Sequence, residues 1–224
     1  MRFVARILGV IVVVLLLPFV GTALAGARAG GLAGAGLAVL AVLWLWLWLP
    51  RSAHDAFESG KYMAAQRRYR LLGLLAPSAA RERAALLSRA GCFVASGQVE
   101  RAEQLLASFD TSTLAAAERA VWLNNRACAA LAAGTDPHAA LALVDEATAI
   151  RPDVPAVQHT RGMALLAVGR IDDAIAVLDG MRAAGELPPR LEAERCRDLA
   201  KAWSQKGQAA YAEDYRLRAE ALAR

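Results

Sequence analysis

The sequence predicts an all-α protein in which an N-terminal transmembrane helical hairpin is followed by an α-solenoid of four to five helix pairs. Two observations support this prediction. Residues 1–50 contain no acidic residue and only three arginines, so two long uncharged stretches dominate the start of the chain. Beyond residue 50, similar ten-residue segments recur at intervals of 37 and 35 residues. The chain therefore divides into a hairpin at 1–50 and a helical repeat domain at 51–224.

The hairpin is predicted from the length of its uncharged stretches, Ile7–Ala27 and Ala29–Pro50, which have 21 and 22 residues. A helix needs about 20 apolar residues to cross the hydrocarbon core of a bilayer. Backbone groups in lipid must be satisfied within their own segment, so we expect helical spans at about 5–25 and 30–49. Basic residues flank the hairpin on both sides, whereas Arg28 alone lies in its turn. The positive-inside rule then places the protein in the inner (cytoplasmic) membrane, with the repeat domain in the cytoplasm.

Met1–Ala25 also fits a cleaved signal peptide. It has a basic start, an apolar run, and Ala23-Leu24-Ala25 as a cleavage site. We favour a span because the apolar run exceeds the usual 7–15 residues or so of a signal peptide. If the second stretch spans the membrane, both interpretations leave the chain from Arg51 onward in the cytoplasm. Whether Met1–Ala25 is removed stays open.

Three tryptophans mark the end of the second predicted span. Trp44, Trp46 and Trp48 alternate with leucines, and on a helix they would lie around its circumference. Tryptophan prefers the membrane–water interface, so together with Arg51 these residues are expected to anchor the span there.

Glycines recur every four residues between the two spans, with Gly30 and Gly34 as the central pair. Small residues at this spacing allow two helices to approach closely. We expect them to pack the hairpin, because the partner helix is tethered by a short turn. Self-association through Gly30 and Gly34 is the alternative.

The repeat domain is predicted from three segments that align without gaps: Ser88–Gly97, Asn125–Gly134 and Thr160–Gly169. Each reads as a small or polar residue, Arg, Ala or Gly, four mostly apolar residues, Ala, any residue and Gly. Their spacing is close to the roughly 34 residues of a helix–turn–helix solenoid unit. After each glycine an apolar stripe with helical period follows, so each segment predicts a helix that ends at the glycine and a second helix after it.

These residues resemble the tetratricopeptide repeat (TPR) family. Gly60, Tyr62, Ala65, Tyr69 and Pro77 have the spacing of the second half of that repeat, and the run from Gly162 to Ala174 is the most similar of all. The resemblance covers roughly residues 51–224. It implies a TPR-like solenoid that binds a protein or peptide partner.

The family register also implies which side chains would face that partner: Asn124, His159, Met163, Arg197 and Lys201. Met163 supplies a flexible apolar contact, and Arg197 and Lys201 place two positive charges one helical turn apart. An acidic peptide with an apolar anchor would suit this combination.

The arginine that recurs in each aligned segment has two interpretations. Arg89, Arg126 and Arg161 are secondary candidates for partner binding, because stacked guanidinium groups bind carboxylates bidentately. Alternatively, their stems pack between helices and their heads bond carbonyls or the acids of the second helices. We favour packing, because the resemblance places these positions against the neighbouring helix.

Charge is concentrated at the start of the chain. Of the net charge of +5, residues 1–50 contribute +3, and further basic residues follow the second span. Attraction to anionic membrane lipid, worth ~1 kcal/mol per basic residue near the surface, accounts for this pattern. The later repeats have no basic stripe interleaved with aromatic residues, so we expect no nucleic-acid partner.

Catalytic and metal-binding patterns are absent from the sequence. Cys92, Cys128 and Cys196 are far apart and fit small buried positions, and the three histidines are isolated. We therefore predict no catalytic residue, no metal, no cofactor and no enzymatic activity. The expected function is a membrane-anchored TPR scaffold or adaptor at the cytoplasmic membrane face. The alternative is an accessory subunit of a membrane enzyme or of a secretion or envelope assembly, since the layout is similar to that of HemY-like proteins.

Overall fold

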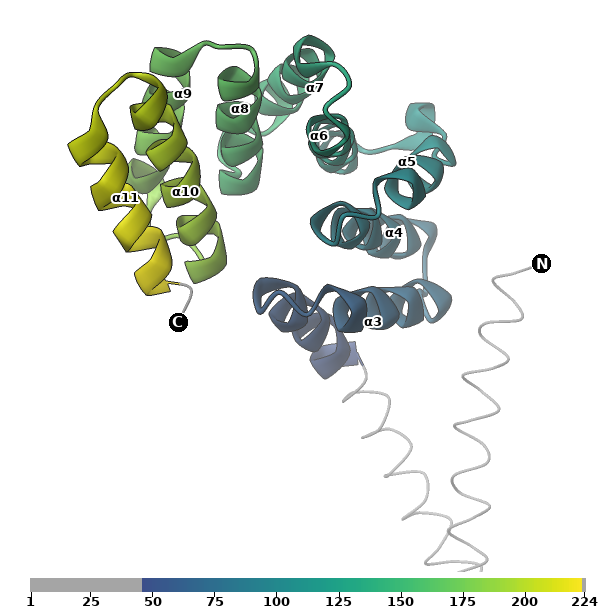
Figure 1. The fold of residues 1–224 in the computed structure, drawn as a ribbon. Helices are drawn as coiled ribbons and strands as arrows, with labels where there is room; N and C mark the ends of the chain where they lie inside the picture. Colours follow the sequence, from purple (N-terminus) through teal and green to yellow (C-terminus); the bar gives the residue numbers. More distant parts are fainter. Residues whose placement is uncertain (1–45, 223–224) are drawn as a thin grey trace, which may run out of the picture. The chain divides into compact units, whose positions relative to one another are not determined.

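A computed structural model describes residues 46–222 of the chain (Figure 1). The predicted first span, most of the second, Trp44, the Gly30 and Gly34 pair and the signal-peptide alternative all lie outside the described residues. Within 46–222, no helix is long and apolar enough to cross a membrane.

The described residues form helices joined by turns, with no strand between residues 46 and 222. The predicted all-α class is confirmed for this part of the chain. A helix at 46–58 comes first. Two 3₁₀ turns, Thr111–Thr113 and Met181–Ala184, interrupt the series. The other helices are α3 (Tyr62–Leu74), α4 (Ala79–Ala95), α5 (Val99–Ala107), α6 (Ala116–Ala133), α7 (Pro137–Ile150), α8 (Pro155–Ala167), α9 (Ile171–Gly180), α10 (Pro189–Gln205) and α11 (Ala209–Leu222).

The helices follow one another as first and second members of helix–turn–helix pairs, and a glycine lies in the turn inside each pair. These glycines have φ between 65° and 77°, a left-handed conformation that only glycine adopts readily. The predicted stops after Gly97, Gly134 and Gly169 are confirmed. Gly60 and Gly207 are the other two turn glycines of this kind. Residues 46–222 therefore form five helix–turn–helix pairs.

Contacts between Cα atoms divide the chain into two compact units. Among the described residues, unit 1 consists of 46–57 and 63–89, and unit 2 of 58–62 and 90–222. In unit 1 small residues let the helices pack closely, since Ala53 and Ala65 are fully buried.

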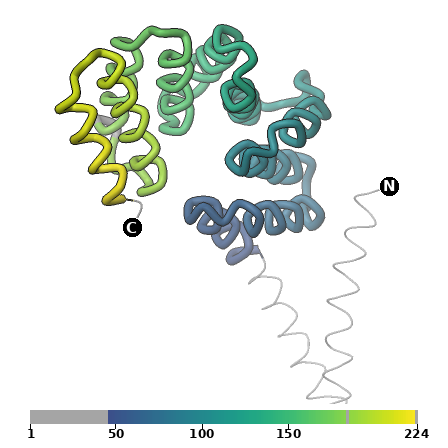
Figure 2. Tube along the Cα trace, viewed as in Figure 1, coloured from purple at the N-terminus to yellow at the C-terminus, as the bar shows by residue number. Residues whose placement is uncertain are grey.

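The core of unit 2 lies between its successive helices, through which the chain passes in sequence order (Figure 2). One cluster joins α6, α7 and α8 around Leu123, Val144 and Leu165. A second joins α9 and α10 around Leu178 and Leu199. The helices of unit 2 therefore stack by burying apolar side chains against their immediate neighbours, as in other repeat architectures.

Helices α8 and α9 approach each other closely at Gly162, where the family register predicted close packing. A Cβ atom added to Gly162 would lie 2.6 Å from Cγ and Cδ2 of Leu178, so only glycine fits there. Ala174, on the facing side of α9, has no exposed surface. The predicted register of this repeat is therefore confirmed.

Candidate protein-binding face

Unit 2 brings its first helices together in sequence order. Helix α6 contacts α8, and α8 contacts α10. Asn124 lies on α6, His159 and Met163 on α8, and Arg197 and Lys201 on α10. All five residues that the family register assigned to the partner therefore lie on consecutive helices that touch one another.

A buried ion-pair network links α8 to α10. His159 Nε2 lies 3.0 Å from Asp198 Oδ2, and Lys201 Nζ donates to Asp198 Oδ1 at 2.7 Å. Burial would raise the pKa of Asp198, but the hydrogen bonds and charges of His159 and Lys201 outweigh it and the pKa is lowered. Asp198 is therefore a carboxylate at neutral pH.

His159 is the one predicted contact residue that the fold buries, with 6% of its surface exposed. Its ring is held against Asp198, so it influences the surface by positioning Asp198 and, through it, Lys201. The other predicted residues are more accessible. Arg197 and Lys201 are exposed, and Asn124 and Met163 are half-buried.

A second hydrogen-bonded chain links α6 to α8, and its direction can be worked out. Thr160 Oγ1 donates to the Ala156 carbonyl at 2.9 Å, so its oxygen is left to accept. Burial raises the pKa of the Cys128 thiol. This protonated thiol lies 3.2 Å from Thr160 Oγ1 and donates to it. Asn124 Nδ2 in turn lies 3.9 Å from the sulfur, as the donor to Cys128.

One hydrogen-bond acceptor atom remains unused at the Asn124 end of this series of hydrogen bonds. Oδ1 of Asn124 is buried and has no hydrogen-bond partner among the described residues. A buried acceptor without a partner is costly, but this atom is closed to solvent, so a partner can contact only the accessible part of the half-buried Asn124. Met163 lies on α8, which contacts both α6, the helix of Asn124, and α10, the helix of Lys201. We call Asn124, Met163, Arg197 and Lys201 the first-helix face.

The charges of this face are mostly positive. Lys201 keeps 68% of its side chain exposed while it binds Asp198. Arg197 forms no salt bridge within residues 46–222. Glu194 lies nearby on α10, but Arg190 Nη1 donates to its carboxylate at 2.7 Å. The face therefore offers exposed cations, and its nearest acids are already bound.

The recurring arginines are engaged with the solenoid itself. Arg161 Nε donates to Asp145 Oδ1 of α7, the second helix of the preceding pair, at 2.7 Å. The Arg126 guanidinium lies 5.2 Å from the centre of the Trp122 ring. Arg89 is half-buried. These contacts favour the packing interpretation for Arg126 and Arg161.

Sequence reasoning missed the most buried cation of unit 2. Arg195 has 1% of its surface exposed, and its guanidinium bonds both carboxylate oxygens of Glu192 at 2.7 Å and the Leu178 carbonyl at 3.2 Å. The only signal in the sequence is a Glu–Arg pair three residues apart, which is equally typical of an exposed helix surface. Arg195 ties the end of α9 to α10 and is unavailable to a partner.

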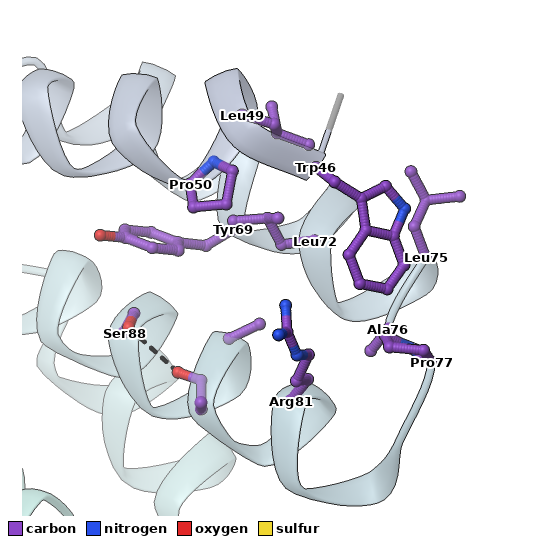
Figure 3. A pocket seen from close by; sticks show the side chains of 12 residues that line it. Trp46, Leu49, Pro50, Tyr69, Leu72, Leu75, Ala76, Pro77, Arg81 and Ser88 are labelled. Carbon is purple, nitrogen blue, oxygen red and sulfur yellow. Dashed lines mark hydrogen bonds between the residues drawn. The ribbon is translucent and has the colours of Figure 1, made fainter. Parts of the chain in front are cut away.

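Unit 1 contains an apolar pocket of about 250 Å³ between the helix at 46–58, α3 and the start of α4 (Figure 3). Its walls include Leu49, Tyr69 and Leu72, and Figure 3 shows the Arg81 side chain pointing from α4 towards Trp46. The Arg81 guanidinium lies 5.1 Å from the centre of the Trp46 ring. The lining contains no carboxylate, histidine or cysteine, and Arg81 is its one charged side chain.

The described members of the predicted membrane-interface anchor lie at the start of unit 1. Trp46 and Trp48 are 37% and 42% exposed. Arg51 is also exposed and donates to the Leu47 carbonyl at 3.0 Å. Their role at a membrane stays a prediction.

Residues 46–222 contain no group of three or more His, Cys, Asp or Glu side chains that could hold a metal ion. The absence of a cofactor stays a prediction.

No protein-family model matches the chain. No curated protein gives a significant sequence match. Three solved structures do match in fold. A point variant of a Podosopora anserina kinesin light chain with nearly identical TPR-like repeats is 21% identical, with a TM-score of 0.50, and the match covers 78% of this chain and 92% of that one. A second structure of that protein has a TM-score of 0.49 at the same identity and coverage. A MamA structure (MamA MSR-1 C2) is 18% identical, with a TM-score of 0.46, over 79% of this chain and 95% of that one.

The fold is a TPR-like α-solenoid. The kinesin light chain match supports this at the level of architecture, and five helix–turn–helix pairs with a glycine in each turn agree with it. The predicted solenoid is confirmed. The predicted membrane hairpin lies outside the described residues.

Proposed function

We propose that the protein is a scaffold or adaptor that binds a protein or peptide partner on the first-helix face of unit 2. We further propose that residues 1–50 hold it in the cytoplasmic membrane, with the repeat domain in the cytoplasm. The TPR-like fold and the exposed cations Arg197 and Lys201 on the first-helix face support the first part. The two uncharged stretches of 21 and 22 residues support the second.

The chemistry of the first-helix face selects an acidic peptide with an apolar side chain. Met163 is half-buried and adapts its flexible thioether to an apolar anchor. Arg197 and Lys201 attract carboxylates. Buried anchors supply most of the affinity of such complexes, whereas exposed charges mainly accelerate the encounter. We assign no reaction to the protein.

The test is a charge reversal on the first-helix face of the full chain. Met163→Glu combined with Lys201→Glu places two carboxylates where we expect an acidic, partly apolar partner. The matched control is Ala176→Glu combined with Arg101→Glu, which changes the net charge equally at exposed positions of the second helices α9 and α5. Partners are captured from detergent extracts and identified by mass spectrometry.

We expect the Met163 and Lys201 double variant to lose the captured partners and the control to retain them, with equal helicity by circular dichroism. If the double variant recovers the same partners as the parent, the first-helix face is not the binding site. Partners that all belong to one membrane complex would favour the accessory-subunit alternative.

A further inference from the structure

Positive charge in this protein is concentrated in unit 1. Its described residues contain seven arginines and two acids, whereas those of unit 2 contain fifteen basic and nineteen acidic side chains. Burial, followed by repulsion from Arg70, lowers the pKa of Arg89. Arg70 and Arg89 are thus close enough to repel each other, and an external anion would relieve that repulsion.

Unit 1 also exposes much apolar surface. Of the ten large hydrophobic side chains that are exposed in the described residues, six lie in unit 1. Three of them, Met63, Leu71 and Leu74, belong to the exposed side of α3 and are 55%, 40% and 51% exposed. Apolar side chains gathered on one exposed surface commonly mark an interaction site.

Helix α3 combines both features on a single face. At about 100° per residue, its exposed residues fall within an arc of about 100°. This exposed stripe consists of Met63, Arg67, Arg70, Leu71 and Leu74. Helix α3 contains no acidic residue. Across residues 46–222, neither Arg67 nor Arg70 forms a salt bridge.

The remaining faces of α3 hold unit 1 together. Ala65 and Gly73 are buried, and Gly73 approaches Ala85 of α4. Tyr69 and Leu72 line the apolar pocket (Figure 3). The exposed stripe is therefore not needed for the packing of the unit.

We propose that the exposed stripe of α3 docks on an anionic bilayer surface. A helix face that combines arginines with leucine and methionine buries its apolar side chains at the headgroup boundary, while its cations pair with lipid phosphates. Twelve residues, 50–61, separate the predicted end of the second span from the start of α3, which brings α3 within reach of the membrane surface. This inference rests on the membrane attachment proposed above. It adds a second, lipid-selective contact.

The test uses the full chain reconstituted into lipid nanodiscs, either of phosphatidylcholine alone or with added phosphatidylglycerol. Hydrogen–deuterium exchange of residues 62–74 reports the docking of α3. The test variant is Arg67→Glu with Arg70→Glu. The control is Arg101→Glu with Arg182→Glu, which changes the net charge equally at exposed sites of unit 2.

Docking predicts that exchange in α3 slows when phosphatidylglycerol is present and speeds up again at high salt. One basic residue near an anionic surface changes binding about fivefold, so loss of two lowers the docked-to-free ratio about 30-fold. The test variant should therefore lose the protection, and the control should keep it.

Two outcomes would overturn the inference, and the experiment distinguishes failure of docking from failure of the membrane attachment. A chain that stays in the disc but shows equal exchange in α3 with and without phosphatidylglycerol refutes docking alone. A chain that does not remain with the disc refutes the membrane attachment and docking together.

Discussion

Replacement of Gly162 by alanine tests the close contact between α8 and α9. A Cβ atom at this position would lie 2.6 Å from two carbons of Leu178, far inside the optimal separation of about 3.5–4.0 Å. Leu178 has no exposed surface, so its side chain cannot swing into solvent. Alanine gains ~1 kcal/mol of helix propensity over glycine, whereas overpacking costs about 1–3 kcal/mol. Because Leu178 is fully buried, the upper part of that overpacking range, about 2–3 kcal/mol, applies, and we expect Gly162→Ala to destabilise the fold by about 1–2 kcal/mol net.

The assay is thermal unfolding of the full chain in mild detergent, followed by circular dichroism. For a domain of this size 1 kcal/mol changes the Tm by about 2–4 °C, so the expected fall is about 2–8 °C. Gly73→Ala is the matched control. Its Cβ would lie 3.7 Å from that of Ala85, an ordinary contact, so the Tm should be unchanged or raised.

A double-mutant cycle identifies the cause of the fall. Leu178→Ala alone should cost about 2–5 kcal/mol, because it leaves a cavity. With Leu178 shortened, the added methyl group at residue 162 no longer clashes, so the two effects should be non-additive by about 1 kcal/mol or more. If Gly162→Ala raises the Tm as Gly73→Ala does, the close α8–α9 contact is refuted.

Three further predictions address the register, the buried carboxylate and the topology. Ala174→Leu overpacks a fully buried site and should lower the Tm, and an unchanged Tm would place Ala174 at the surface. The lowered pKa of Asp198 means that its ionised form stabilises the fold above its unfolded pKa of about 3.9, and that this contribution is lost as the pH falls further. The Tm of Asp198→Asn should therefore lie below that of the parent at pH 7 and approach it below pH ~4, and equal values at pH 7 would contradict the network. A reporter fused after Arg224 should be active only in the cytoplasm, and periplasmic activity would overturn the topology. The mass of the same fusion shows whether Met1–Ala25 is removed.

The repeat architecture could be predicted because it depends on local features of the sequence. Each first helix ends at a residue with a left-handed backbone conformation, which glycine adopts at the least cost. The spacing of Gly97, Gly134 and Gly169 therefore indicates where the helix–turn–helix pairs lie. The close packing at Gly162 was expected from the resemblance to the TPR family, whereas nothing in the sequence indicated that Leu178 is the side chain it meets.

The environment of His159 could not be predicted from the sequence. Its partner Asp198 lies 39 residues away on the next first helix, and no periodicity in the sequence joins them. The link from Cys128 to Thr160 spans 32 residues in the same way. Both links depend on how α6, α8 and α10 are oriented about their axes relative to one another. The residue pattern within one helix does not specify this orientation.

The exposed stripe of α3 was also hidden from sequence reasoning, although the excess of positive charge around it was not. The order of residues shows that Arg67 and Arg70 share a helical face with Leu71 and Leu74. It does not show which face of α3 is exposed. That depends on the packing of Ala65, Tyr69 and Leu72 within unit 1.

Site-specific photocrosslinking tests the proposed scaffold function most directly. The photoreactive residue p-benzoylphenylalanine is placed at Met163 on the first-helix face or at Ala176, an exposed position on the second helix α9. Cells expressing each full-length variant are irradiated, and the adducts are identified by mass spectrometry. Binding on the first-helix face predicts a protein adduct at Met163 that is absent at Ala176. An adduct at Ala176 with none at Met163 would contradict it.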